Sequence, residues 1–173
     1  RNSMKFIFAF LLLLLALGSA NATDKYYCRC DTGASTSPAC VAGSDANSGL
    51  SAVLAKSTAP SESDFNSAAA GDRFLFCRGG AWTGLSSIEL SNTNVSAASP
   101  LTVDAYTASF GATVLPLLQW TSGSNAFVFG GFDPPEFSSN ATADGGYVFR
   151  NTHYKSASPG GGIAFWVIGQ VSE

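Results

Sequence analysis

The stretch GDRFLFCRGGAW, residues Gly71 to Trp82, marks the change from an irregular segment to a succession of short strands. A short apolar run predicts a strand, with Phe74 and Phe76 on its buried face and Arg73 and Leu75 on the other side. Gly79 and Gly80 then predict a turn. Because no helix pattern follows these glycines, the stretch does not predict a phosphate-binding loop.

Short apolar runs separated by turn-forming residues continue downstream. They are rich in β-branched and aromatic residues and lack a long helical periodicity, so each predicts a strand. The runs cover residues 74–76, 87–90, 101–106, 114–120, 126–129, 147–149 and 163–168. Three of them share a large-x-Phe pattern, which predicts coils of roughly 20 residues with Phe129, Phe149 and Phe165 stacked as an internal ladder. An ordinary β-sandwich is the alternative.

The segment before Gly71 predicts a helical cap. Pro60 divides residues 50–70 into short helical pieces, and Ser61 followed by acidic residues predicts a helix start. The predicted buried face consists of Leu50, Val53, Leu54 and Phe65. Further upstream, Asp45 and Asn47 predict a plain turn, because the segment lacks the downstream bidentate glutamate of a calcium loop.

The first 22 residues predict a secretory signal peptide. Lys5 precedes an apolar run over residues 6–17, and Ala20 and Ala22 form a small-x-small cleavage site. An uncleaved anchor is the alternative, but the run is shorter than a typical membrane span. Residues 1–3 precede the start methionine and are upstream translated sequence or a cloning scar. The chain is therefore expected to be secreted to the extracellular space or the cell surface, without a membrane contact after cleavage.

The four cysteines are Cys28, Cys30, Cys40 and Cys77. An even number in an exported chain predicts two disulfides. Cys28 and Cys30 are too close in the sequence to pair comfortably, which leaves two sets: Cys28–Cys40 with Cys30–Cys77, or Cys28–Cys77 with Cys30–Cys40. A metal site is the weaker alternative, because the spacing is Cys-x-Cys and the single histidine, His153, is far away in the sequence.

Composition narrows the class of protein and its partners. Charged residues make up 12% of the chain, the net charge is −3 and no basic patch is visible, which argues against a nucleic-acid partner. About 150 residues remain after signal cleavage, enough for one domain. Residues 23–70 are expected to form a disulfide-linked N-terminal segment and residues 71–173 the strand-rich part. Glycosylation motifs at Asn94 and Asn140 predict N-linked glycans in a eukaryotic source.

Several motifs resemble the start of secreted right-handed parallel β-helix proteins of the pectin-lyase-like superfold. They are CVAGSDANSGLSA, AAAGDRFLFCRGGAW and SPLTVDAY, and the later FRNTHYKSASPGGGIAF resembles coils of such proteins. The resemblance covers about residues 26–170. It implies an all-β fold, a right-handed parallel β-helix solenoid with a short N-terminal capping helix. The chain has room for four or five of the 20-residue coils and shows no C-terminal cap, so it is expected to be a fragment or to stack end to end as a homo-oligomer.

The resemblance implies a protein that binds or processes extracellular polysaccharide, like a polysaccharide lyase or a glycoside hydrolase. Such lyases use a Lys or Arg base and usually Ca²⁺, while hydrolases use paired carboxyl groups. No cofactor is expected beyond that Ca²⁺. The candidate catalytic residues are Arg150, His153, Lys155 and Asp144, and the candidate substrate-binding residues are Trp82, Asp133 and Glu136.

Two interpretations of these residues remain open. His153 is the single histidine and could carry a proton near neutral pH, and Trp82 follows a Gly-Gly turn, where a surface aromatic could stack on a sugar ring. Alternatively, the charged residues are solvated turn charges, and the chain is a structural or adhesive extracellular glycoprotein.

Overall fold

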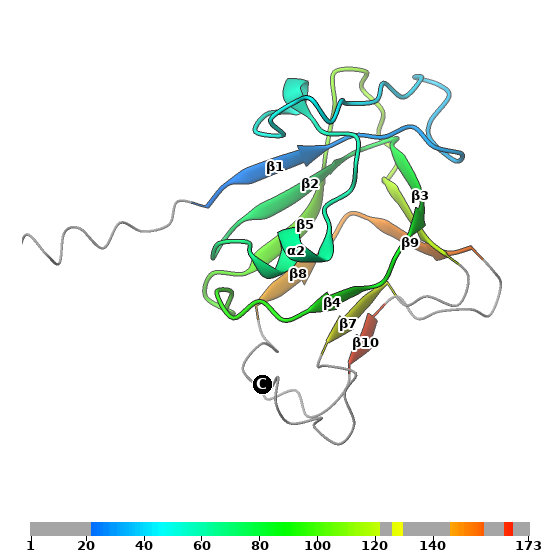
Figure 1. Cartoon of the computed structure of the whole chain (residues 1–173). Helices are drawn as coiled ribbons and strands as arrows, with labels where there is room; N and C mark the ends of the chain where they lie inside the picture. Colours follow the sequence, from blue (N-terminus) through cyan, green and yellow to red (C-terminus); the bar gives the residue numbers. More distant parts are fainter. Residues whose placement is uncertain (1–21, 122–125, 130–145, 158–164, 168–173) are drawn as a thin grey trace, which may run out of the picture.

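The computed structural model describes residues 22–121, 126–129, 146–157 and 165–167, without the side chains of residues 129 and 165–167, and shows a β-rich fold with little helix (Figure 1). The elements are β1 (Asp24–Tyr27), a 3₁₀ turn η1 (Ala52–Leu54), α2 (Glu62–Asn66), β2 (Arg73–Cys77), β3 (Ala81–Leu85), β4 (Ile88–Leu90), β5 (Leu101–Tyr106), β6 (Leu117–Trp120), β7 (Phe127–Phe129), β8 (Tyr147–Phe149), β9 (His153–Ser156) and β10 (Phe165–Val167). No helix among these residues is long and apolar enough to cross a membrane.

The strands form three parallel sheets. Sheet I has the order β1-β2-β5-β8, sheet II the order β3-β6-β9 and sheet III the order β4-β7-β10. From β2 to β10 the chain visits sheets I, II and III three times in that sequence, and each strand pairs in parallel with the strand of the preceding visit. Figure 1 shows the three sheets arranged around one interior.

The predicted strands are all present, and three further strands were not predicted. The run over residues 101–106 matches β5, and the other six runs overlap with β2, β4, β6, β7, β8 and β10. The missed strands are β1, β3 and β9. In β3, Gly84 interrupts the pattern, and β9 is polar on its exposed side, so neither resembles an apolar strand run.

The predicted repeat of about 20 residues and its phenylalanine ladder are wrong. In sheet II, 36 residues separate Ala81 from its partner Leu117, and 36 more separate Leu117 from His153. Phe149 belongs to sheet I, whereas residues 129 and 165 belong to sheet III and are not partners there. The three runs look alike in sequence, but β7 and β10 belong to sheet III and β8 to sheet I.

Aromatic side chains fill the interior. Phe74 and Phe76 are 0% and 2% exposed, which confirms their predicted inward orientation. Trp82 is also fully buried, and its indole N–H donates to the Ser57 carbonyl oxygen at 3.1 Å. The expectation of a surface aromatic at this position is therefore wrong, because β3 continues directly from the Gly-Gly turn and places Trp82 opposite the buried Leu118.

The N-terminal segment contributes a short helix beside β4, and this helix starts at Ser61 as predicted. Ser61 and Asp64 form a capping box at the start of α2. The Glu62 carboxylate accepts from the Glu89 backbone N–H at 3.0 Å, and Asn66 donates to the Glu89 carbonyl oxygen at 2.9 Å. These side chains bind the free backbone N–H and carbonyl groups at the edge of β4, where a neighbouring strand would otherwise bind them.

Of the four apolar residues predicted to form the buried face of this segment, only one is buried. Phe65 is 1% exposed, whereas Leu50, Val53 and Leu54 are largely exposed. The structure has a single 3₁₀ turn over residues 52–54 instead of an amphipathic helix, and this turn buries none of its residues. The predicted turn at Asp45 and Asn47 is confirmed, since the Asn47 backbone N–H donates to the Ser44 carbonyl oxygen at 2.9 Å, and Gly49 follows it with a positive φ of 74°.

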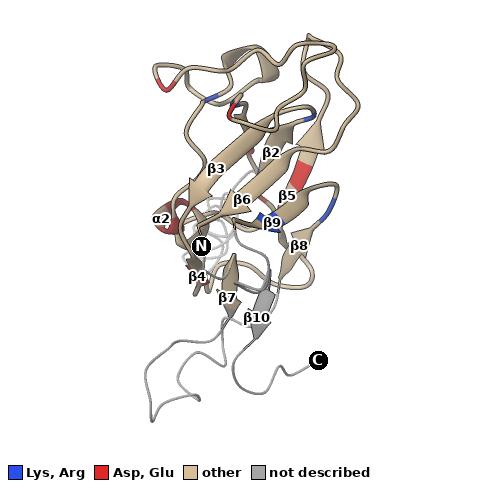
Figure 2. Cartoon of the chain, turned by 90° about the vertical axis from the view of Figure 1, so that its right-hand side faces the viewer, with Lys and Arg blue, Asp and Glu red and all other residues tan. Residues whose placement is uncertain are grey.

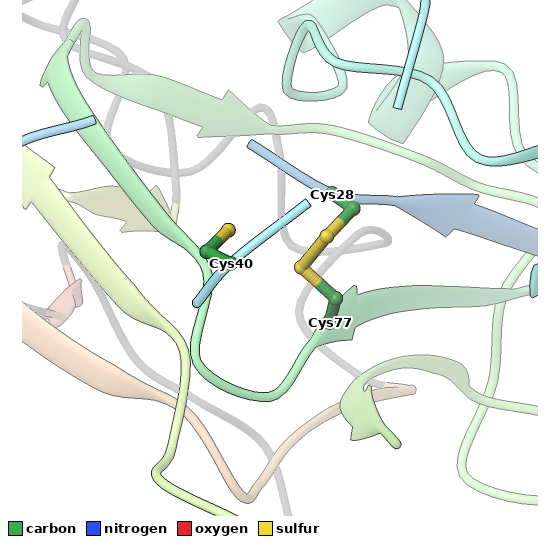
Figure 3. Close-up of side chains that lie close together, drawn as sticks. All are labelled: Cys28, Cys40 and Cys77. Atoms are coloured by element: carbon green, nitrogen blue, oxygen red, sulfur yellow. A yellow bond between two sulfur atoms is a disulfide. The ribbon is translucent and has the colours of Figure 1, made fainter. Parts of the chain in front are cut away.

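The disulfides follow the second predicted set. Cys28 is bonded to Cys77, and Cys30 to Cys40, so all four cysteines are paired. The first bond joins the end of β1 to the end of β2 (Figure 3). Gly80 is required beside it, because a Cβ at this position would lie 2.6 Å from the Cys77 sulfur.

Candidate functional site

Two ion pairs cross the outer face of sheet I. Asp24 on β1 pairs with Arg73 on β2, whose Nε donates to the carboxylate at 2.6 Å. Asp104 on β5 pairs with Arg150, which directly follows β8 and donates from Nε at 2.7 Å. Because Leu75 is the β-sheet partner of Asp104, and positions 73 and 75 share a face, the two pairs lie on one surface.

Asp104 is buried although it is charged. Its carboxylate accepts hydrogen bonds from Arg150, from the Asn151 side-chain amide at 2.8 Å and from the Ala105 backbone N–H at 2.7 Å. Burial alone would raise the pKa of Asp104, but these donors and the Arg150 charge outweigh it and hold the pKa below the usual value. Asp104 is therefore ionised at neutral pH and fixes the position of Arg150.

The turn after β8 places further basic side chains beside this pair. Asn151 has a φ of 54°, a left-handed conformation that asparagine tolerates, and the chain then enters β9 in sheet II. His153 and Lys155 are two residues apart on β9 and both side chains are exposed. We call Arg150, His153 and Lys155 the basic corner. Figure 2 shows blue after β8 and on β9, and red on β5.

The structure describes three of the four predicted catalytic residues and does not bring them together in one catalytic cluster. Arg150 is engaged on sheet I, whereas His153 and Lys155 belong to sheet II. Within the described residues these three make no hydrogen bond or ion pair with one another. The remaining candidates, Asp144, Asp133, Glu136 and the glycosylation residue Asn140, lie outside the described residues.

Sequence analysis missed Asp104 and its contact with Arg150. Asp104 lies in a strand that was read as an apolar run, and 46 residues separate it from Arg150. The one available signal was a carboxylate in the middle of an apolar strand, because such a group needs a buried partner.

The other carboxyl groups with shifted pKa values also favour the ionised form. Hydrogen bonds from the backbone and side chains of Thr58 and Ser57 lower the pKa of Asp45 to about 2. Asp45 thus holds the predicted turn against residues 57–58. The pKa of Asp24 is lowered by its hydrogen bond from Arg73. The pKa of Asp31 is lowered too, since hydrogen bonds from Arg29 and Thr83 outweigh the effect of burial. None of these shifts is the upward one that a general acid needs.

A cleft of about 350 Å³ opens elsewhere, between residues 58–62 and the connection from β3 to β4. Core aromatic residues line it, including Phe65, Phe76, Trp120 and Phe127. Trp120 is 2% exposed and its indole N–H donates to the Ser86 carbonyl oxygen at 2.7 Å, so its role is structural. No residue of the basic corner lines this cleft.

The Asp104–Arg150 pair predicts a pH-dependent contribution to stability. The pKa of Asp104 is lower in the folded chain, so the contribution is present above the unfolded value near 3.9 and is lost as pH falls through the folded value. We expect Asp104→Asn to lower the free energy of unfolding at pH 7 by about 1–3 kcal/mol. Urea denaturation from pH 7 to pH 2.5 measures this, and the difference from wild type should shrink towards acidic pH. A constant difference at every pH would contradict the prediction.

Comparison of the chain with protein-family models, with curated proteins and with solved structures found no match. The family resemblance is therefore a prediction from the quoted motifs, and the following proposals depend on the geometry described above.

Proposed function

We propose that the three parallel sheets are the sides of a right-handed β-helix. The proposal is supported by the regular order in which the chain visits sheets I, II and III and by the parallel pairing of successive visits. The right-handed sense follows from the strong preference for right-handed crossovers between parallel strands of one sheet. An experimental structure with a left-handed connection from β2 to β5 would overturn it.

We propose further that this protein binds an anionic extracellular polysaccharide, such as a polymer of uronic acids, through the basic corner. The observation that carries the proposal is that Arg150, His153 and Lys155 are all exposed within six residues of the chain. The carboxylate next to Arg150, that of Asp104, is already paired with it. The Arg150 side chain is 55% exposed, and within the described residues only its Nε is engaged. Its remaining N–H groups can therefore donate to a uronate carboxylate.

The geometry supports binding better than cleavage. A catalytic base must have a nitrogen available to the substrate, but the Arg150 Nε already donates to the Asp104 carboxylate at 2.7 Å. Hydrolysis requires a protonated carboxyl group, and the pKa of Asp104 is shifted in the opposite direction. Arg150 and Asp104 together thus form a fixed ion pair rather than an acid–base pair.

Binding of polygalacturonate tests the function. We expect the Arg150→Ala/Lys155→Ala variant to bind at least about fivefold more weakly than wild type at low ionic strength, because charge-assisted contacts are lost. Isothermal titration calorimetry measures the affinity, and added salt should weaken wild-type binding. Arg29→Ala removes a similar, partly exposed cation and is the matched control. Arg29 is far from the basic corner. Its neighbour Cys30 pairs with Ala81, which pairs with Leu117, which pairs with His153, so three strand spacings, roughly 14 Å, separate Cys30 from His153.

Three results would contradict this function. They are equal affinities of the double variant and wild type, an equal loss in Arg29→Ala, and unsaturated products detected by ultraviolet absorbance with the wild-type protein. The last result would show lyase activity and would return Arg150 and His153 to the catalytic role predicted from the sequence.

A structural or adhesive glycoprotein is the second candidate, and one observation favours it. Asn94 is exposed in a turn after β4, where an oligosaccharide transferase could reach it. In this case the parallel strands would act as a rigid spacer, and the basic corner variant would bind polygalacturonate as well as wild type does.

A further inference from the structure

The two disulfides lie side by side. The sulfur atoms of Cys28, Cys40 and Cys77 are all within 4.8 Å of one another, although Cys40 is bonded to Cys30. Figure 3 shows Cys40 beside the bond that joins Cys28 to Cys77. Cys30 is not a member of this sulfur group in the described residues. Cys40 is therefore the member of the exposed disulfide whose sulfur lies close to the buried disulfide.

The two disulfides differ in their access to solvent. Cys28 and Cys77 are 2% and 0% exposed, whereas Cys30 and Cys40 are partly exposed. An external thiol reaches an exposed disulfide more readily than a buried one. Direct reduction should therefore open Cys30–Cys40 first and leave Cys40 as a free thiol next to an intact disulfide.

We propose that Cys40 transfers reduction from the exposed disulfide to the buried one by intramolecular thiol–disulfide exchange. In the first step an external thiolate attacks the Cys30 sulfur, forms a mixed disulfide with it and releases the Cys40 thiolate. In the second step Cys40 attacks Cys28, the Cys28–Cys77 bond breaks, and a Cys28–Cys40 bond forms while Cys77 leaves as a thiolate that takes up a proton. Attack on Cys77 gives Cys40–Cys77 and releases Cys28 instead.

The exchange would have a structural consequence that reduction of the exposed bond alone lacks. Cys28–Cys77 is the covalent link between the N-terminal segment and β2, across 49 residues. Transfer to Cys28–Cys40 keeps the new bond within the N-terminal segment and frees β2. An extracellular thiol would thus remove the covalent link between the N-terminal segment and β2 when Cys40 attacks Cys28, whereas attack on Cys77 would keep a link to β2 through Cys40.

Two single variants of the full chain test the proposal. Cys30→Ser leaves Cys40 without its partner but beside the buried disulfide, and Cys40→Ser leaves Cys30 free outside the sulfur group. After blocking of free thiols, trypsin separates residues 26–29, 30–56 and 74–78, which carry the relevant cysteines. We expect peptide 30–56 to be disulfide-linked to 26–29 or 74–78 in Cys30→Ser, at a level roughly tenfold above Cys40→Ser. Mass spectrometry of the unreduced peptides measures both links.

Retention of only the 26–29 to 74–78 link in Cys30→Ser would overturn the proposal, and so would equal exchange in the two variants. If a single variant does not fold, the reduction rate of Cys28–Cys77 in dithiothreitol decides. The rate should be at least about tenfold faster in wild type than in the Cys30→Ser/Cys40→Ser variant, which lacks the transferring sulfur. An equal or faster rate in the double variant would overturn the proposal.

Discussion

The Cys28→Ala/Cys77→Ala variant is expected to lose about 4 kcal/mol of the free energy of unfolding relative to wild type. The bond joins residues 49 positions apart, and the entropy that a cross-link removes from the unfolded chain grows with the length of the closed loop. Both residues are buried, so the change also affects packing around the ends of β1 and β2. Guanidinium denaturation under non-reducing conditions measures the difference.

The Cys30→Ala/Cys40→Ala variant is the matched control. This bond joins residues only ten positions apart, and the same relation predicts a smaller loss of about 3 kcal/mol. The order of the two losses is the decisive result. A larger loss for the short loop would show that the unfolded chain is not the main origin of the stabilisation.

Trp82→Ala is expected to cost about 3–5 kcal/mol of unfolding free energy, the range for removing a large buried aromatic. Trp82 is fully buried, and its ring centroid lies 4.9 Å from that of Phe76. The surface position expected from the sequence would instead predict almost no change in stability. Chemical denaturation followed by circular dichroism therefore separates the two placements of this residue.

Trp82→Phe is the control for this prediction. It keeps an aromatic ring in the core but removes the indole N–H that donates to the Ser57 carbonyl oxygen. We expect a loss clearly smaller than that of Trp82→Ala, because most of the buried apolar surface remains. A stability of Trp82→Ala within about 0.5 kcal/mol of wild type would contradict the buried placement.

The local structure of this protein could largely be predicted, because it depends on short patterns. The apolar run over residues 74–76 predicted the strand with Phe74 and Phe76 in the core, and Ser61 with the acidic residues after it predicted the start of α2. In contrast, β1, β3 and β9 were missed, since each acquires its strand geometry from parallel partners distant in the chain. Pairing across 36 or more residues leaves no local signal in strands of four or five residues.

The candidate site likewise has features that the sequence predicts and features that depend on distant parts of the chain. The sequence by itself determined which residue types were available at the basic corner, the even number of cysteines and the two admissible pairings. Only the tertiary structure decided between those pairings, because it brings Cys77 beside Cys28 through the alignment of β1 with β2. The tertiary structure also decided the role of Arg150. The parallel pairing of β5 with β8 places this cation against the buried carboxylate of Asp104, a residue in the middle of an apolar strand. Strand register is a property of distant segments, and it sets which charges meet and how each is solvated.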